Sequence, residues 1–295
     1  MISVYGEGLI DLVPQPDSAA DPALAALRPA LGGGPYNVAV AAARQGASVN
    51  FHSRLSTDAF GQALADRLRA EGVGTAHLQR GPEPTTLAVS ALDASGQATF
   101  RFYNEGTADR LVEPEAAPAD VACFGTCSLA WEPGAGRYAE VLHSLSASGT
   151  LVALDPNIRP SFATEAHHEF LLSLLPHVTV LKLSEEEVEF FGGEEALAAA
   201  PVVVTTHGGE GLRVRTATLE LHVPSPRVDV VDTIGAGDTV MGTLLRLIDA
   251  AGLGPAEVAG LGEDAWRKML QTCAAAAAIT CSRAGAQPPT LAELG

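Results

Sequence analysis

Lysine is scarce in this chain of 295 residues. Only Lys182 and Lys268 occur, and 18 basic residues stand against 35 acidic ones, so the formal net charge is −17. A surface this acidic repels a polyphosphate backbone, and nucleic acid is therefore not expected as a partner. A small phosphorylated ligand would have to be held largely by backbone amides, a metal ion and a few arginines.

Cysteines and long apolar runs are also few. The four cysteines, at positions 123, 127, 273 and 281, form no Cys-x-x-Cys pair, which favours reduced thiols over a zinc site or a disulfide framework. The N-terminal residues 1–14 have no basic segment and include Glu7 and Asp11, unlike a signal peptide. No run approaches the ~20 apolar residues of a membrane span. We expect a cytoplasmic protein without membrane contact, and its 47% hydrophobic content is enough for a large core.

Two common nucleotide-binding motifs are missing. No Gly-Lys-Ser or Gly-Lys-Thr occurs, which excludes a Walker A loop, and no glycine run after a strand completes a dinucleotide fingerprint. Any nucleotide site must therefore be of another kind.

Short β-type runs alternate with longer helical runs along most of the chain. This pattern predicts a doubly wound α/β fold, with a mainly parallel sheet covered by helices on both faces. Strands are expected near residues 3–8, 49–53, 121–124, 151–154, 178–181 and 202–205, and helices near 38–45, 59–71, 137–145, 165–175, 236–251 and 264–280.

Residues 85–103 interrupt this alternation with two β-type runs around residues 93–96. No helix follows either run, so a hairpin is expected. Together with residues 12–31 it could form a small β lid, 12–31 and 85–104, beside a main domain made of residues 1–11, 32–84 and 105–295. The alternative is an ordinary edge hairpin on the main sheet.

The segment VDTIGAGDTVMGTLL, residues 231–245, places small residues directly before a helical pattern. The backbone amides of Gly235, Ala236 and Gly237 can approach an anion closely, and a helix N-terminus adds positive partial charge. Asp238 falls in the first turn of that helix. It could be a catalytic acid or base, or it could simply favour the helix dipole.

Two further segments present polar groups next to flexible backbone. In LGGGPYNVAVAAARQG, residues 31–46, Asn37 could cap the following helix or offer its amide to a ligand. In DPNIRP, residues 155–160, polar side chains follow a buried strand, where open α/β sheets bind ligands. A turn with a surface arginine is the alternative there.

Taken in order, these segments resemble the two signatures of the ribokinase/PfkB family of carbohydrate kinases. The resemblance spans the whole chain and includes GEGLIDL, FRFYNEGTADR, DPNIRP, KLSEEE, VTTHGGEG and ITCSRAGAQPP. It implies an ATP-dependent sugar kinase with a small β lid. In that family the acid of the GAGD motif accepts the proton of the sugar hydroxyl, and the preceding amides hold the transferring phosphoryl group. Those roles fall on Asp238 and on Gly235, Ala236 and Gly237.

The resemblance also implies the ligand-binding positions. The sugar-binding residues are Asp11, Gly33, Asn37, Phe102, Arg159 and Asp238, and the nucleotide-binding residues are Asn157, Ser184, Thr206, Gly208, Gly211, Gly235 and Gly237. Glu187 would reach Mg²⁺ through water, although Ser184 stands where the family motif usually has asparagine. Asp232, Ile234 and Ser282 match the loops that hold K⁺ in several relatives. Lids of this kind often pair, so a homodimer through the lid is expected.

The motifs are most similar to the fructokinase branch of the family, so fructose is the expected acceptor. A 2-keto-3-deoxygluconate kinase would need an arginine just after the Phe-Tyr pair of the lid to bind a carboxylate, where this chain has Asn104. Arg101 lies three residues earlier, on the opposite face of a strand. Ribokinase or nucleoside kinase activity remains an alternative, as does a non-catalytic sugar-binding protein, although the intact Asp238 argues against the latter.

Overall fold

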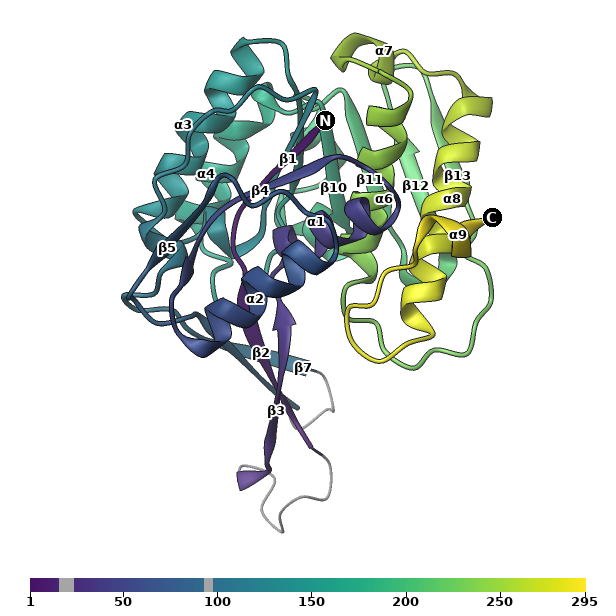
Figure 1. Cartoon of the computed structure of the whole chain (residues 1–295). Coiled ribbons are helices and arrows are strands. Elements are labelled where there is room, and N and C mark those ends of the chain that lie inside the picture. The colour runs from purple at the N-terminus through teal and green to yellow at the C-terminus, as the bar shows by residue number, and fades with distance from the viewer. Residues whose placement is uncertain (16–23, 93–97) are drawn as a thin grey trace.

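The computed structural model describes residues 1–15, 24–92 and 98–295, which form two separate sheets (Figure 1). The main sheet has nine strands in the order β13-β12-β11-β10-β9-β8-β1-β4-β5. Its seven strands from β11 to β5 run parallel to one another. Strand β12 pairs antiparallel with β11, and β13 pairs antiparallel with β12. The strands are β1 Ile2–Tyr5, β4 Val49–Ser56, β5 Leu78–Gly81, β8 Val121–Gly125, β9 Leu151–Asp155, β10 Val180–Ser184, β11 Val202–Thr206, β12 Leu212–Arg215 and β13 Glu220–Val223.

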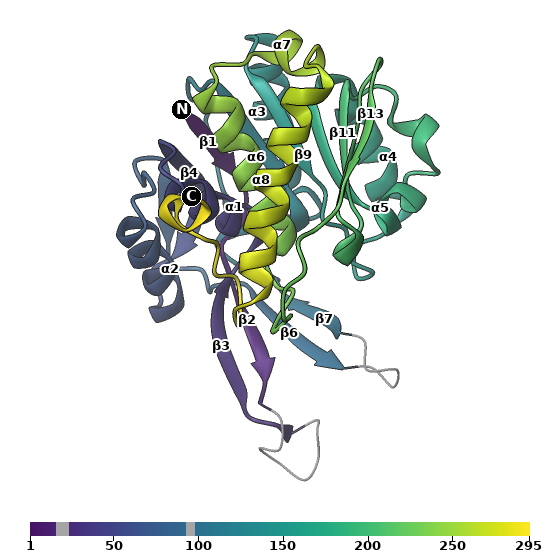
Figure 2. The ribbon, with the colours of Figure 1, turned by 90° about the vertical axis from the view of Figure 1, so that its right-hand side faces the viewer.

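Helices cover both faces of this sheet, which confirms the doubly wound α/β prediction (Figure 2). One face packs against α1 Gly34–Arg44, α2 Ala59–Ala70, α6 Ala236–Ala250 and α8 Glu263–Cys281. The other packs against α3 Gly134–Ala147, α4 Glu165–Leu174 and α5 Glu185–Phe190, and α7 Pro255–Ala259 and α9 Leu291–Leu294 are short. Central strands such as β8 and β9 are buried at every position, as expected for strands covered on both faces.

The small sheet has the order β3-β2-β6-β7 and extends from one end of the molecule. Its strands are β2 Leu9–Pro14, β3 Leu27–Gly32, β6 Leu87–Leu92 and β7 Ala98–Tyr103. The edge-hairpin alternative is therefore wrong, because β6 pairs with β2 and with β7, and neither β6 nor β7 pairs with a strand of the main sheet. The small sheet also takes in residues 9–11, which the sequence had assigned to the main domain. The predicted turn at 93–96 lies outside the described residues.

The largest local correction concerns the start of α1. The helix begins at Gly34, four residues before the predicted start, because Pro35 lies in its first turn and Gly33 serves as the N-cap residue. Asn37 is therefore inside the helix, and of the two alternatives for this residue the capping one is wrong.

Other predicted elements are confirmed with small shifts. The first strand ends at Tyr5 instead of residue 8, and α3 begins at Gly134 instead of 137. The antiparallel strands β12 and β13 were not predicted, and neither was the short helix α5. All four cysteines carry free thiols. Within the described residues, the helices are too short or too polar to cross a lipid bilayer.

Candidate active site

The first turn of α6 holds the acid that the sequence singled out. Gly235 precedes the helix in the left-handed conformation, with φ of 76°, and an added Cβ would lie 2.6 Å from Cβ of Ala286. Glycine is thus required there on both conformational and steric grounds. Asp238 is only 8% exposed, and its Oδ2 accepts a 2.8 Å hydrogen bond from Nδ2 of Asn37. The two glycine-rich segments therefore meet through these two side chains.

Burial raises the pKa of Asp238, while the Asn37 hydrogen bond and the charges of Lys182 and Arg159 lower it. An acid with a raised pKa is a better proton acceptor once ionised than an ordinary aspartate. The environment therefore fits Asp238 to proton transfer more closely than its place at a helix start alone suggested.

The buried side chain of Glu7 holds the start of α1 in place. Its carboxylate accepts a 3.1 Å hydrogen bond from the Gly34 amide and further bonds from the hydroxyls of Thr126 and Ser128. Gly33 has φ of 107°, and an added Cβ would lie 2.7 Å from the carbonyl oxygen of Glu7. Sequence reasoning missed Thr126 and Ser128, because each lies about 120 positions from Glu7 and belongs to no recognisable motif.

Asp11 approaches the site from the small sheet. It lies in β2, paired with Ala30 and Ala88. Burial, followed by the negative charge of Asp238, raises the pKa of Asp11 to about 7, and Arg159 opposes this shift. The structure thus brings Asp11 of the small sheet and Asp238 of helix α6 within electrostatic range of each other.

Residues 155–160 supply polar groups at the end of β9. Asn157 adopts a left-handed conformation with φ of 45°, which is uncommon for a residue other than glycine. Arg159 lies over the ring of Phe100 at 5.9 Å and favours the charged forms of Asp11 and Asp238. A surface turn would not place a guanidinium within electrostatic range of both acids.

Phe102 is half-buried and helps to attach the small sheet to the main domain. Its ring packs edge-on against Trp131 at 5.1 Å and lies 6.1 Å from Phe162. Phe102 thus packs β7 of the small sheet against side chains of the main domain.

The predicted nucleotide-side residues follow the neighbouring strands β10 and β11. Ser184 caps α5 by accepting a bond from the Glu187 amide, and Glu187 accepts a 2.7 Å bond from the Ser184 amide in return. The same carboxylate accepts a 2.8 Å bond from the Ile158 amide. Serine at position 184 therefore has a capping role, and Glu187 ties α5 to the DPNIRP loop.

Thr206 pairs with Ser184 at the end of β11 and leads into a turn of two left-handed glycines. Gly208 has φ of 51° and Gly211 has φ of 122°. An added Cβ on Gly211 would meet the carbonyl oxygen of Val223, so that glycine is needed for packing whether or not a nucleotide lies beside it.

The two predicted cation loops also come together. Oδ1 of Asp232 accepts a 3.0 Å hydrogen bond from the Ile234 amide, and Oδ2 accepts a 2.8 Å bond from the Gly285 amide. The Ser282 hydroxyl donates to the carbonyl oxygen of Ile279, inside its own helix. Asp232 thus joins the two loops beside Gly235, whereas the Ser282 side chain points to its helix.

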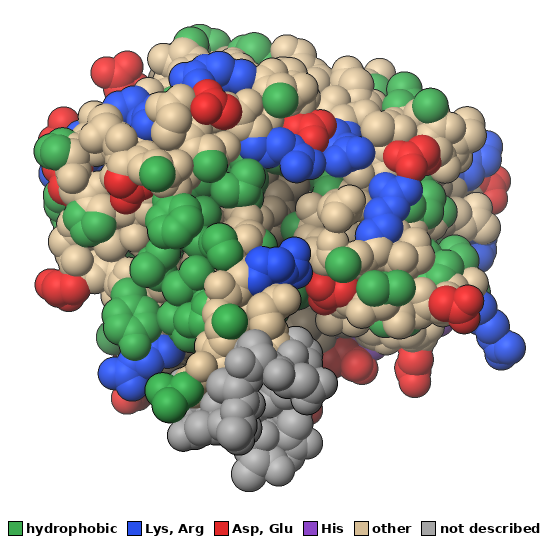
Figure 3. Space-filling view, turned by 60° about the horizontal axis from the view of Figure 1, so that its bottom comes forward, with side chains coloured by type: hydrophobic (Ala, Val, Ile, Leu, Met, Phe, Trp, Pro, Cys, Tyr) green, Lys and Arg blue, Asp and Glu red, His purple; other side chains and the backbone are tan. Residues whose placement is uncertain are grey.

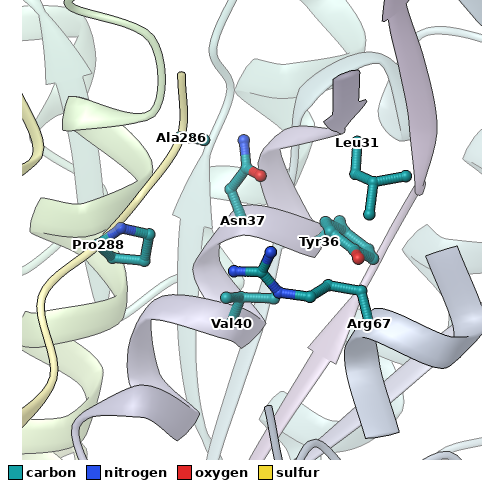
Figure 4. A pocket seen from close by; sticks show the side chains of 7 residues that line it. All are labelled: Leu31, Tyr36, Asn37, Val40, Arg67, Ala286 and Pro288. Carbon is teal, nitrogen blue, oxygen red and sulfur yellow. The ribbon is translucent and has the colours of Figure 1, made fainter. Parts of the chain in front are cut away.

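Beside Asn37 lies a pocket with an empty volume of about 280 Å³ (Figure 4). Its lining residues come from α1, α2, β3 and the loop before α9: Leu31, Tyr36, Asn37, Val40, Arg67, Ala286 and Pro288. Figure 3 views the end of the molecule from which the small sheet extends, where apolar side chains gather beside a hollow.

Glu187 is the residue that the sequence predicts to hold Mg²⁺ through water. Among residues 1–15, 24–92 and 98–295, His, Cys, Asp and Glu side chains form no group of three that could hold a metal ion. Mg²⁺ usually binds through one or two carboxylates, waters and substrate phosphates. Glu187 fits that pattern, because each of its oxygens accepts one amide bond and can still accept another from a metal-bound water.

Together these groups can orient a polyol and transfer a phosphoryl group to it. Asp11 and Asn37 offer hydrogen bonds to hydroxyls, Asp238 can accept a proton, and the amides at the start of α6 can stabilise an anion. A buried acid and a half-buried acid within electrostatic range of one arginine are typical of a catalytic site and would be costly in a purely structural one.

Comparison with known proteins agrees with this geometry. The profile of the pfkB family carbohydrate kinases matches residues 1–293. A fructokinase from Rhizobium leguminosarum bv. trifolii is 34% identical over 284 residues, covering 90% of this chain and 86% of the relative. Crystal structures of fructokinase from Xylella fastidiosa with bound ATP and of a Vibrio cholerae O395 double mutant with fructose, ADP and potassium ion superpose with TM-scores of 0.90 and 0.86. Their identities are 29% and 25%, and each match covers 99% of this chain and 96% of that structure. The chain therefore belongs to the pfkB family of carbohydrate kinases.

Proposed function

We propose that the protein transfers the γ-phosphoryl group of ATP to the 6-hydroxyl of fructose. The observation that carries this proposal is the 2.8 Å hydrogen bond between Asn37 and Asp238. It joins the sugar-side glycine segment to the phosphoryl-side glycine segment, so that an acceptor hydroxyl and a phosphate could meet at one buried carboxylate. The names of the relatives, fructokinases in both bacteria and plants, support fructose as the acceptor.

Each residue then has a defined part. Asp11, Gly33, Asn37, Phe102 and Arg159 bind the sugar, and Asp238 accepts the proton of the attacking hydroxyl. The amides of Gly235, Ala236 and Gly237 bind the phosphoryl oxygens, since phosphoryl transfer depends chiefly on positioning and charge stabilisation. Asn157, Ser184, Thr206, Gly208 and Gly211 lie along the nucleotide.

Mg²⁺ would be bound by the nucleotide phosphates and, through water, by Glu187, and it would neutralise part of the phosphate charge. We further propose a K⁺ site at the loops that Asp232 joins, with Ile234 and Ser282 contributing backbone carbonyls. The bound potassium ion of the Vibrio relative supports this. Equal activity in K⁺ and in a large organic cation at the same ionic strength would refute the K⁺ site.

A neutral sugar fits the small sheet better than a sugar acid does. Arg101 is exposed, whereas its neighbour Phe102 is half-buried toward the site, so the guanidinium of Arg101 is on the outer face of β7. We propose that the small sheet closes over the acceptor as a lid and that two lids pair in a cytoplasmic homodimer.

A panel of acceptors tests the proposal. ADP release should be measured with ATP and fructose, ribose, 2-keto-3-deoxygluconate and a set of nucleosides, and ³¹P NMR should identify the product as the 6-phosphate. We expect the highest kcat/KM with fructose. A higher kcat/KM with 2-keto-3-deoxygluconate or a nucleoside would mean that this compound, and not fructose, is the acceptor. No release of ADP with any of these compounds would refute kinase activity.

A further inference from the structure

One of the two lysines of the chain is buried beside the candidate active site. Lys182 lies in β10 and is only 5% exposed, whereas Lys268 is exposed on α8. Nζ of Lys182 lies 3.0 Å from Oδ1 of Asp155, the last residue of β9, which is also buried. Lysine is rarely buried unless it is paired, so the position of Lys182 calls for an explanation.

The ammonium lies directly behind the amides at the start of α6. A Cβ added to Gly237 would be 3.3 Å from Nζ and 3.9 Å from Cε of Lys182. A side chain at position 237 would therefore crowd the ammonium and require it to shift by a few tenths of an ångström. The absence of a side chain lets the lysine reach the same point as the helix N-terminus, where an anion is expected to bind.

Three carboxylates act electrostatically on this one cation. Burial alone would lower the pKa of Lys182, but the negative charges of Asp155, Glu187 and Asp238 raise it above its ordinary value. The side chain is thus a full positive charge at neutral pH. Arg159 is the other cation acting on Asp238, so these two groups offset several acids where a triphosphate would add more negative charge.

The ammonium is not saturated by its partner. An ammonium has three N–H donors, and within the described part of the chain Lys182 has one polar partner, Asp155. The free donors are in a buried position that faces Gly237. Leaving them unbonded is costly, and phosphate oxygens are acceptors that would satisfy them.

We propose that Lys182 is the cationic part of the anion hole: its ammonium contacts the transferring phosphoryl group, and Asp155 is the positioning residue that holds it. This inference rests on the proposed phosphoryl transfer at Asp238. It assigns a catalytic function to a strand residue that lies outside both glycine-rich segments.

A purely structural ion pair is the competing explanation, and it makes a different prediction. Buried ion pairs can often be replaced by neutral residues of similar size without loss of stability, whereas removing one partner leaves an unpaired buried charge. The double variant Lys182→Met with Asp155→Asn removes both charges and leaves the net charge of the pair unchanged. Lys268→Met is the matched control, because it removes the other lysine from an exposed position.

Steady-state kinetics with ATP and fructose, or the best acceptor of the panel, decide between the two. We expect kcat of the double variant to fall by about 100-fold or more, similar to the loss of one anion-hole donor. Asp155→Asn alone keeps the ammonium and should lose about tenfold or less. Lys268→Met should retain wild-type kcat. A double variant with wild-type kcat would overturn the proposal, and so would an Asp155→Asn loss as large as that of the double variant.

Nucleotide binding gives a second measurement that does not depend on turnover. Calorimetry with Mg²⁺ should show that the double variant weakens ATP more than ADP, because the proposed contact is to the transferring group. An unchanged ratio of the ADP and ATP dissociation constants would argue against that contact, even if Lys182→Met alone failed to fold. If the wild-type protein phosphorylates no acceptor, the proposed function itself fails, which is a separate outcome.

Discussion

The main domain and the small sheet contribute to the site in different ways. The main domain presents Asp238 in the first turn of α6, where it is buried and accepts a hydrogen bond from Asn37. The small sheet presents Asp11 half-buried, with its carboxylate close to Gly32 of the neighbouring strand. Chemistry needs a fixed geometry, whereas acceptor entry needs a surface that can open. We infer that the main domain determines the rate of transfer and the small sheet determines which acceptor is held.

The largest expected effect concerns Asp238 in the main domain. Asp238→Asn preserves size but removes the proton acceptor, and general-base contributions are typically ~10²–10⁴ in rate. We expect kcat to fall by at least about that range, while ATP affinity changes little or tightens because a carboxylate beside the γ-phosphate is gone. Initial rates and ATP calorimetry measure both.

The matched control is Asp264→Asn, which removes an exposed acid from the first turn of another helix, α8. It should keep wild-type kcat and change only stability, by about 0.3–1 kcal/mol. A folded Asp238→Asn enzyme with near wild-type kcat would show that Asp238 is also just a dipole-favouring acid.

The small-sheet acid should act on sugar binding instead. Hydrogen bonds to a charged group are worth about 1.5–3 kcal/mol. Asp11→Asn should therefore lower kcat/KM for the sugar by about 10- to 150-fold. The dissociation constant for ATP should not change. Ser90→Ala, a half-buried position on β6 of the same sheet, is the control for general disturbance of the sheet. An Asp11→Asn effect on ATP binding as large as that on sugar binding would contradict this division of roles between the main domain and the small sheet.

The position of Asp11 also predicts a pH dependence. Its pKa is raised to about 7 by burial and by Asp238, so the free enzyme takes up a proton at Asp11 as the pH falls through 7. The protonated acid accepts hydrogen bonds less well, and kcat/KM for the sugar should therefore decline about tenfold per pH unit below that value. The Asp11→Asn variant should lack this decline. If the same decline persists in the variant, another acid is responsible for it.

Much of the fold could be predicted because its signals are local. The small residues before Asp238 and the helical pattern after it mark the start of α6 without reference to the rest of the chain. The contact of Asn37 with Asp238 spans 201 positions, and that of Glu7 with Thr126 spans 119, so no local pattern could reveal either. For Lys182, sequence shows only that a charge ends an apolar run; its partner Asp155 depends on strands β9 and β10 being neighbours.

The smallest effect should appear in the backbone dynamics of the small sheet. If this sheet closes over the acceptor, the amides of β6 and β7 should exchange about two- to tenfold more slowly with sugar and nucleotide bound, because closure excludes water from the site. Strands β8 and β9, buried at every position, are the internal reference and should change little. Hydrogen exchange followed by mass spectrometry resolves these segments.

Phe102→Ala removes the ring contacts with Trp131 and Phe162 that attach the sheet to the main domain, so ligand protection of β6 and β7 should be reduced in that variant. Exchange in these strands that is the same with and without saturating ligands would mean that the small sheet is a fixed wall of the site, and specificity would then have to be explained by the static positions of Asp11 and Arg159.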